Sequence, residues 1–186
     1  MMYKYCQTEA SSRRQRSIEN GMLELMQNRS YEEITVSELC KFLNIPRNTF
    51  YRYFDAKDDV VNALIDNIVL DFCPKLSRNG QLEEMERFFD YWFQNRNVLD
   101  VIQRNGLGSK LIDRFVRQGH DYFDDGMYRI IAKDTATQKH LTQFAYGGVM
   151  TMILHWHYSG CQESPKEMAH FCFQIFTHTI FSQDNL

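Results

Sequence analysis

The sequence predicts an all-helical protein, and three features of the 186-residue chain support that prediction. Apolar residues recur at spacings of three and four through most of its length, which is the period of an amphipathic helix. Helix-capping patterns stand before several of these segments. No convincing alternation with a period of two is present, so no strand is expected. We therefore expect about nine helices, divided between a small N-terminal domain and a larger C-terminal one.

Composition and charge describe an ordinary globular protein. Hydrophobic residues make up 44% of the chain, charged residues 24%, and the net charge is −3. This charge excludes a protein that coats nucleic acid without selection, since such proteins are strongly basic. The cysteines are odd in number and lack C-x-x-C spacing, which favours free thiols in a reducing compartment. Because no signal core and no run of ~20 apolar residues is present, we expect a soluble, cytoplasmic protein.

The first helix is expected to begin at Ser11 or Ser12, either of which can cap it, and to end near residues 28–30. Three basic side chains lie close to its start: Arg13, Arg14 and Arg16. They form a positive cluster on a chain that is otherwise slightly acidic. Such a cluster suits a DNA backbone, although solvated surface charge is the alternative.

A second, short helix is predicted to begin at Val36. Thr35 and Glu38 have the spacing of a capping box, in which each side chain binds a backbone amide of the other residue. The helix should stop at Asn44, because Asn tolerates the left-handed conformation that ends helices. Pro46 then suits the first turn of a new helix, where its missing amide is no loss. The stretch therefore predicts two helices joined by a tight turn.

The new helix carries more polar side chains than a buried helix could accommodate. Arginine and asparagine are shaped to bind guanine and adenine edges in the major groove, while threonine and tyrosine hydroxyls bind phosphates. No acidic residue occurs between Lys41 and Phe54, and Phe50 is the expected buried anchor. An ordinary surface helix with aromatic packing is the alternative. The whole pattern favours a surface that contacts DNA.

The order T-V-x-x-L-x-x-x-L-N-I-P-R-N-T-F-Y-R-Y-F-x-x-K-D-D resembles the DNA-binding domain of the TetR family of transcriptional regulators, over residues 13–70. The resemblance implies a helix-turn-helix followed by a helix that leads into a ligand-sensing domain. It places Arg13 and Arg14 near the DNA backbone. The residues implied to touch phosphates are Thr35, Tyr51, Tyr53 and Lys57, and those implied to face bases are Arg47, Asn48, Thr49 and Arg52. Pro46 departs from the usual serine cap and Asn48 from the usual small residue, often glycine.

A fourth helix is expected over residues 56–72, with Asp55 able to cap it and Pro74 discouraging its continuation. Apolar residues lie on more than one of its faces, so it should contact both domains. We place the DNA-binding domain at residues 1–57, with residues 56–72 as its connecting helix. Residues 75–186 then form a helical domain for effector binding and dimerisation.

Five further helices are expected in this domain. The last begins with a capping box, Ser164 to Glu167, and should run to about Phe181. The expected ranges are 82–96, 97–108, 109–131, 135–159 and 165–181. Aromatic and methionine side chains of these helices could line a pocket for a small molecule, or simply fill a core. The pocket candidates are Phe88, Phe89, Trp92, Phe115, Phe123, Met127 and Tyr146.

The last two helices have apolar residues on more than one side, so one face could serve a partner chain. The resemblance implies a four-helix interface between two copies. The candidate interface residues are Phe144, Gly148, Met152, Trp156, Phe171, Ile175 and His178. A two-fold dimer would bind a palindromic operator with half-sites about 34–36 Å apart or a multiple of that. Burial of these faces within one chain is the alternative.

These features together predict a sequence-specific regulator, a repressor that a small-molecule effector releases from DNA. One alternative is an activator controlled by a partner protein, because residues 146–168 resemble a TetR branch that includes the activator of dihydroxyacetone kinase. A remote alternative is a metal-binding helical protein, since six histidines and cysteines lie in the last quarter. We expect no metal, because His155 and His157 point to different sides of a helix. No cofactor and no catalytic motif is expected.

Overall fold

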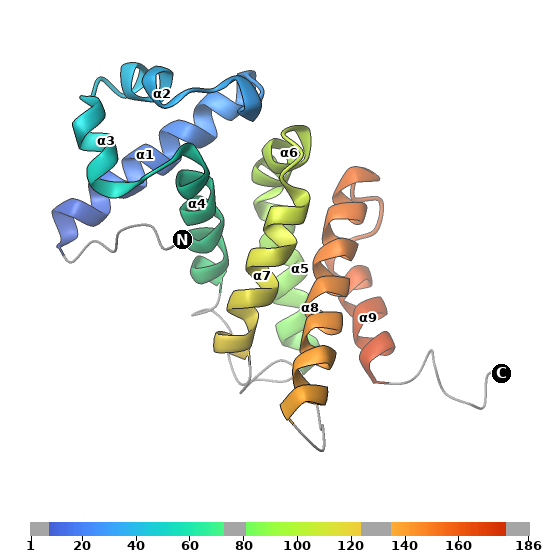
Figure 1. The fold of residues 1–186 in the computed structure, drawn as a ribbon. Coiled ribbons are helices and arrows are strands. Elements are labelled where there is room, and N and C mark those ends of the chain that lie inside the picture. Colours follow the sequence, from blue (N-terminus) through green and yellow to red (C-terminus); the bar gives the residue numbers. More distant parts are fainter. Residues whose placement is uncertain (1–7, 73–80, 124–134, 178–186) are drawn as a thin grey trace.

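The computed structural model describes residues 8–72, 81–123 and 135–177, which form nine α-helices and one short 3₁₀ helix, η1, with no strand among them (Figure 1). The all-helical prediction is confirmed. The helices are α1 (Glu9–Asn28), η1 (Tyr31–Glu33), α2 (Val36–Phe42), α3 (Arg47–Tyr53), α4 (Lys57–Phe72), α5 (Gln81–Gln94), α6 (Arg96–Arg104), α7 (Gly108–Phe123), α8 (Thr135–Tyr158) and α9 (Pro165–Phe176).

Helix α1 begins earlier than expected. Thr8 is its N-cap and accepts the amide of Ser11 at 3.2 Å, while the Ser11 hydroxyl accepts the amide of Thr8 at 3.2 Å. Ser11 thus takes the place that Glu usually has in a capping box, so the prediction that Ser11 or Ser12 caps the helix is wrong. Helix α9 is described as far as Phe176, where the Thr177 amide and hydroxyl both donate to the Phe173 carbonyl at 3.0 Å. Its expected end near Phe181 lies outside the described residues.

The N-terminal half is built around side chains from α1, α2, α3 and α4. Ile18, Met22, Leu39 and Phe50 are fully buried there. Helix α1 passes so close to the end of α2 that a Cβ added at Gly21 would lie only 2.5 Å from Leu43 Cδ2. Glycine at this position therefore lets the two helices approach each other.

Helix α4 packs against both α1 and α7, as expected for a connecting helix. On the α7 side, buried Asp66 accepts hydrogen bonds from Arg114 and Gln118. On the α1 side, the neighbouring Asn67 donates to buried Glu19 at 2.7 Å. Two consecutive α4 side chains thus hold the helix to both halves of the chain.

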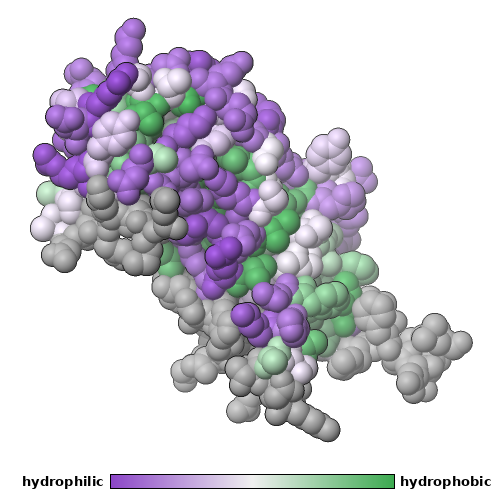
Figure 2. Space-filling model, in the orientation of Figure 1, coloured by the Kyte–Doolittle hydropathy of each residue, from purple (hydrophilic) through white to green (hydrophobic). Residues whose placement is uncertain are grey.

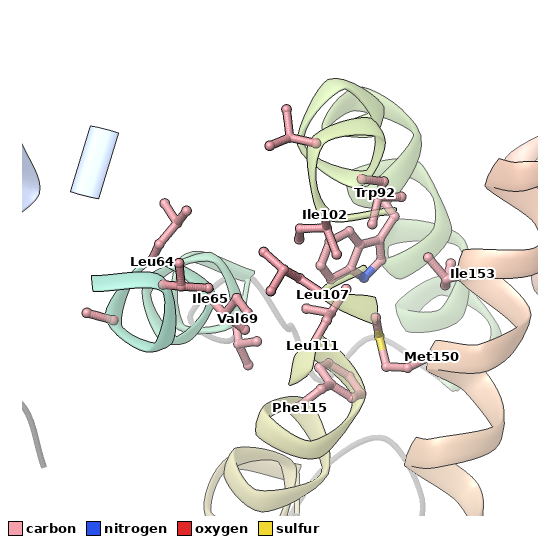
Figure 3. Packing of buried hydrophobic residues seen from close by; sticks show 14 of the residues in the cluster. Leu64, Ile65, Val69, Trp92, Ile102, Leu107, Leu111, Phe115, Met150 and Ile153 are labelled. Carbon is pink, nitrogen blue, oxygen red and sulfur yellow. The ribbon is translucent and has the colours of Figure 1, made fainter. Parts of the chain in front are cut away.

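Helices α5 to α9 pack side by side in the C-terminal half, with α5 against α9 and α7 against α8 (Figure 1). Their buried residues join those of α4 in one apolar cluster. Figure 3 shows Leu64, Ile65 and Val69 of α4 turned toward this cluster. The proposed division into two domains therefore stays a prediction, since the buried side chains form one cluster across it.

In the described part of the chain, no helix has the length and apolar character needed to cross a membrane. Those residues also contain no group of three or more His, Cys, Asp or Glu side chains placed to hold a metal ion. His178, one of the candidate interface residues, lies outside the described residues.

Candidate nucleic-acid interface

The start of α2 has the predicted capping box. The Thr35 hydroxyl accepts the Glu38 amide at 3.2 Å, and the Glu38 carboxylate accepts the Thr35 amide at 2.9 Å. Arg29 also donates to Glu38 at 2.8 Å. The Arg29 hydrogen bond, followed by those from Thr35, lowers the pKa of Glu38 to about 2. Thr35 itself remains exposed at the edge of the helix-turn-helix.

The turn between α2 and α3 closes as predicted, with Asn44 in the left-handed region at φ 52°. The amide of Asn44 donates to the Lys41 carbonyl at 3.2 Å, and that of Ile45 to the Cys40 carbonyl at 2.9 Å. These two bonds make a Schellman motif, the usual left-handed helix ending. Pro46 then stands at the N-cap of α3 without a side-chain cap. The turn orients α3 across the end of α2.

Helix α3 separates its polar and apolar side chains by face. Arg47, Asn48 and Arg52 are exposed, Tyr51 is 46% exposed and Thr49 is half-buried. On the inner side Phe50 and Phe54 are fully buried. The Arg47 guanidinium donates to the Ser37 hydroxyl of α2, so α2 helps to hold this side chain. Sequence analysis did not single out Ser37, although as the second residue of α2 it lies outside the apolar stripe of that helix.

Two residues that were expected to contact phosphates, Tyr53 and Lys57, have their side chains engaged within the protein instead. Tyr53 is only 8% exposed and belongs to the core. The Lys57 ammonium donates to the carbonyls of Tyr31, Glu32 and Ile34 at 2.8, 3.1 and 3.1 Å. These bonds lock the start of α4 onto η1. Both side chains therefore support the helix-turn-helix from within.

Arg13 and Arg14 are both exposed near the start of α1. Arg13 lies 3.6 Å from Glu9, but both side chains are largely in solvent, so the pair contributes little stability. Arg16 lies 3.7 Å from Asp71 of α4. An open groove of about 650 Å³ runs along this helix between Arg13 and Leu43. The positive cluster is thus available for a phosphate backbone.

The pocket candidates that the structure describes pack on one another. Ring centroids lie 5.6 Å apart for Phe88 and Phe115, 6.4 Å for Phe88 and Trp92, and 6.0 Å for Phe115 and Tyr146. Figure 3 shows Trp92 and Phe115 among aliphatic side chains of α6, α7 and α8. Phe89 is equally buried, whereas the side chain of Phe123 and the whole of Met127 lie outside the described residues. The pocket stays a prediction.

An exposed stripe runs along α8 at alternating spacings of three and four. Phe144 is 77% exposed and Tyr158 is 81% exposed, which is unusual for such large apolar side chains. The members of this α8 stripe are Leu141, Phe144, Gly148, Thr151, His155 and Tyr158. Stepping in threes and fours from Phe144 would have found Leu141 and Tyr158, which sequence analysis missed. Figure 2 shows hydrophobic surface over the C-terminal helices and mainly hydrophilic surface over α1–α3.

Other interface candidates vary in exposure. Phe171 of α9 is 49% exposed, while Met152 and Ile175 are half-buried. Trp156 is only 3% exposed, because its indole packs against Phe89 and Phe93 with ring centroids 5.8 and 5.9 Å away. Its side chain belongs to the core of its own chain, so the expectation that Trp156 faces a partner is corrected.

Comparison with known families agrees with this geometry. A model of bacterial regulatory proteins of the tetR family matches residues 21–64. A second model of that family, described as a transcriptional regulator C-terminal region, matches residues 81–178, more than half of the chain. The chain belongs to the TetR family. It is therefore a DNA-binding transcriptional regulator, and the resemblance inferred from residues 13–70 is confirmed.

One curated relative is the HTH-type dhaKLM operon transcriptional activator DhaS of Lactococcus lactis subsp. lactis (strain IL1403). It is 31% identical over 66 residues, which cover 36% of this chain and 34% of that protein. The chain thus aligns with about a third of the length of this TetR-family relative.

Solved TetR-family structures share the fold. A regulator from Streptococcus agalactiae 2603V has a TM-score of 0.65 at 14% identity, covering 90% of this chain and 95% of that one. The dihydroxyacetone kinase operon activator DhaS has a TM-score of 0.59 at 16% identity, with coverages of 90% and 96%. FadR of Thermus thermophilus, solved with lauroyl-CoA, has a TM-score of 0.53 at 13% identity, with coverages of 88% and 93%.

Proposed function

We propose that this regulator is a cytoplasmic homodimer that represses by binding a palindromic operator through α3 and releases it when an effector binds the C-terminal half. One observation carries the proposal. Four polar side chains of α3 are exposed together, while Phe50 and Phe54 anchor the helix from inside; the four are Arg47, Asn48, Tyr51 and Arg52. Such a helix can enter a major groove without losing its own packing.

The contacts divide by chemistry. Arg47, Asn48, Thr49 and Arg52 face base edges, since guanidinium and amide groups bind them through paired hydrogen bonds. Thr35 and Tyr51 bind phosphates through their hydroxyls, with Arg13 and Arg14 extending this contact along the backbone. Lys57 and Tyr53 are left out of this set because their side chains are engaged inside the domain.

The α8 stripe, together with Phe171 of α9, supports the homodimer. Exposed apolar side chains at spacings of three and four can pack against the same surface of a second copy, around a two-fold axis. Two copies of α3 would then reach major grooves about 34–36 Å apart, or a multiple of that. The operator should accordingly be a palindrome.

The effector site lies in the aromatic cluster of α5, α7 and α8. Trp92 Nε1 is buried without a hydrogen-bond partner in the described part of the chain. A buried N–H normally has an acceptor, so this one favours a small molecule that brings an oxygen acceptor into an apolar site. The effector would bind the form of the dimer in which the α3 helices no longer match the operator, and DNA would dissociate.

A second candidate function is activation under the control of a partner protein. It is favoured by the 31% identity over 66 residues with DhaS, an operon activator, and by the close packing of the aromatic rings. A chain of this kind would show no response to small molecules, including lauroyl-CoA, in operator binding. It would respond instead to a partner protein.

The deciding experiment is selection of binding sites from random duplex DNA at two salt concentrations, with Arg47→Ala as a matched variant. A palindromic consensus for the wild type that the variant fails to enrich would support the proposal. Weak binding that falls steeply with salt, without enrichment, would refute sequence-specific recognition by the chain alone.

A further inference from the structure

The α6–α7 turn contacts the DNA-binding half directly, without passing through α4. Asn105 ends α6, and its side chain binds backbone groups on three segments. Its Oδ1 accepts the Tyr31 amide at 2.6 Å, and its Nδ2 donates to the Met26 carbonyl at 3.2 Å and the Val101 carbonyl at 2.8 Å. One amide therefore ties the end of α1 and the start of η1 to α6.

Two of these backbone groups, the Tyr31 amide and the Met26 carbonyl, have no partner within their own helices. The Tyr31 amide begins η1, where the first amides of a helix are unpaired, and the Met26 carbonyl lies in the last turn of α1. The side chains of both residues are buried, at 5% and 3% exposure. Because water has little access there, the Asn105 amide is the group that satisfies them.

Tyr31 is held from α4 and α7 as well. Its hydroxyl donates to Asp58, which lies 3.4 Å from Lys110 of α7. Lys57 lies 4.4 Å from the centre of its ring and donates to its carbonyl. Burial, the Asp58 hydrogen bond and nearby carboxylates raise the pKa of Tyr31, which therefore stays a neutral donor.

The position of η1 affects that of the helix-turn-helix, because η1 directly precedes it in the chain. It leads through buried Ile34 directly to Thr35, the cap of α2, so a shift of Tyr31 displaces the start of α2. The α6–α7 turn holds this segment directly through Asn105, whereas Lys110 of α7 reaches Tyr31 only through Asp58 of α4. A displacement of the turn would reach α2 and α3 even if α4 did not move.

We propose that Asn105 is a positioning residue for DNA recognition, which fixes the α1–α2 connection on the C-terminal half and so sets the separation of the two recognition helices in the dimer. The separation part of this inference rests on the proposed function. The hydrogen bonds themselves do not, so the two can be tested apart.

The first measurement is amide hydrogen exchange at Tyr31, in wild type, Asn105→Ala, Asn105→Asp and Asn97→Ala. Asn105→Ala should exchange about tenfold faster or more, because the acceptor is gone. Asn105→Asp keeps an acceptor and should retain protection, and Asn97→Ala removes an exposed amide from the same helix and should match wild type. Equal exchange in wild type and Asn105→Ala would overturn the proposal.

The second measurement is affinity for the selected palindrome and for duplexes whose half-site spacing is changed by one base pair. Wild type should lose about tenfold in affinity on such a change and Asn105→Ala clearly less, since its DNA-binding halves are less firmly placed. Affinity for a single half-site should be the same for both. A half-site loss in Asn105→Ala would overturn the positioning role, because it would mean a damaged helix-turn-helix.

The two hypotheses fail in different ways. If wild type itself is insensitive to spacing, the palindrome-binding dimer is refuted, and the Tyr31 exchange then decides alone whether Asn105 holds the connection. If the affinities of wild type and Asn105→Ala depend equally on half-site spacing, the palindrome-binding dimer is supported and the role of Asn105 in setting the spacing is refuted.

Discussion

At the scale of single residues, Asn48 and Tyr51 show how neighbouring exposed side chains can have separate roles. Both lie on the outer side of α3. An amide can pair with two atoms of an adenine edge, whereas a phenol hydroxyl is suited to a phosphate oxygen that every sequence presents. The distinction is one of chemistry, since exposure alone is similar for both.

We expect Asn48→Ala to relax base preference at one operator position and to cost about 1–3 kcal/mol there. Tyr51→Phe should weaken binding to all sequences alike and leave the dependence on salt nearly unchanged, because a neutral hydroxyl displaces no counterion. Titration of the variants against the consensus and its single-base substitutions measures both effects. Uniform loss in both variants would contradict the assignment of Asn48 to a base.

Glu19 is a carboxyl group buried in α1, at 2% exposure, where it accepts hydrogen bonds from Gln15 at 2.8 Å and Asn67 at 2.7 Å. Burial raises its pKa above the ordinary value of 4.5, and the two hydrogen bonds only partly oppose this. A raised pKa means that the folded state holds the proton more tightly than the unfolded chain. The contribution of Glu19 to stability is thus fully present below its ordinary pKa and is lost as pH rises through the raised one.

Glu19→Gln should therefore gain stability relative to wild type on going from about pH 4 to about pH 7. Urea unfolding of both proteins at the two pH values measures this change. Glu24→Gln, at an exposed position of the same helix, is the control and should show a smaller change. An unchanged difference for Glu19→Gln would argue that burial does not dominate the pKa.

At the scale of elements, three helices end in the same way. Helices α2, α6 and α8 are each followed by a residue with positive φ: Asn44 at 52°, Gly106 at 67° and Gly160 at 86°. In each case the next residue's amide binds the carbonyl five positions earlier, at 2.9 or 3.0 Å. These endings let helices stop sharply and return at an angle, so that α3 packs against α2 and α7 packs against α4.

Gly21 in α1 and Gly147 in α8 form a matched pair of helical glycines. A Cβ at Gly21 would meet Leu43 at 2.5 Å, whereas one at Gly147 would lie 3.9 Å from Val116. We expect Gly147→Ala to stabilise the fold by about 1 kcal/mol through helix propensity. Gly21→Ala should be destabilising by about 1 kcal/mol net, because displacing Leu43 costs more than the propensity gains. Chemical denaturation compares them, and stabilisation by Gly21→Ala would show that Leu43 moves freely.

At the scale of the whole molecule, the α8 stripe and the α3 surface depend on each other. One copy of α3 is only seven residues long and can contact one half-site. Two copies joined through α8 and α9 would contact both halves of a palindrome, so that each half-site raises the effective concentration of the other. Dimerisation is therefore expected to set operator affinity as strongly as any single base contact.

We expect Phe144→Asp to make the protein monomeric, because a charge at this phenylalanine, which is 77% exposed in the single chain, would be buried against its symmetry mate. Sedimentation measures the change in mass, and circular dichroism should show unchanged helix content. Phe42→Asp is the control, since Phe42 is 46% exposed on α2, away from the α8 stripe, and should leave the oligomeric state intact. A dimer that persists in Phe144→Asp would refute this interface.

Much of the fold followed from short-range patterns. The capping boxes at Thr35 and Ser164, the left-handed Asn44 and the buried Phe50 were all predicted and are present. The capping boxes and the turn depend on groups a few residues apart, so the local chain determines them, and the burial of Phe50 follows from the apolar face of its helix. The early start of α1 escaped prediction because Ser11 serves as the partner of a cap at Thr8, a role that serine rarely takes.

The sequence by itself determined the helical class, the position of the turn and the polar face of α3, because periodicity and capping act within one or two helical turns. Only the tertiary structure decided that Lys57 binds the carbonyls of η1, that Trp156 fills the core and that Asn105 reaches Tyr31. Those side chains face partners more than twenty residues away along the chain. Which of its neighbours a polar or aromatic side chain meets depends on how whole helices pack, and helical periodicity carries no information about that.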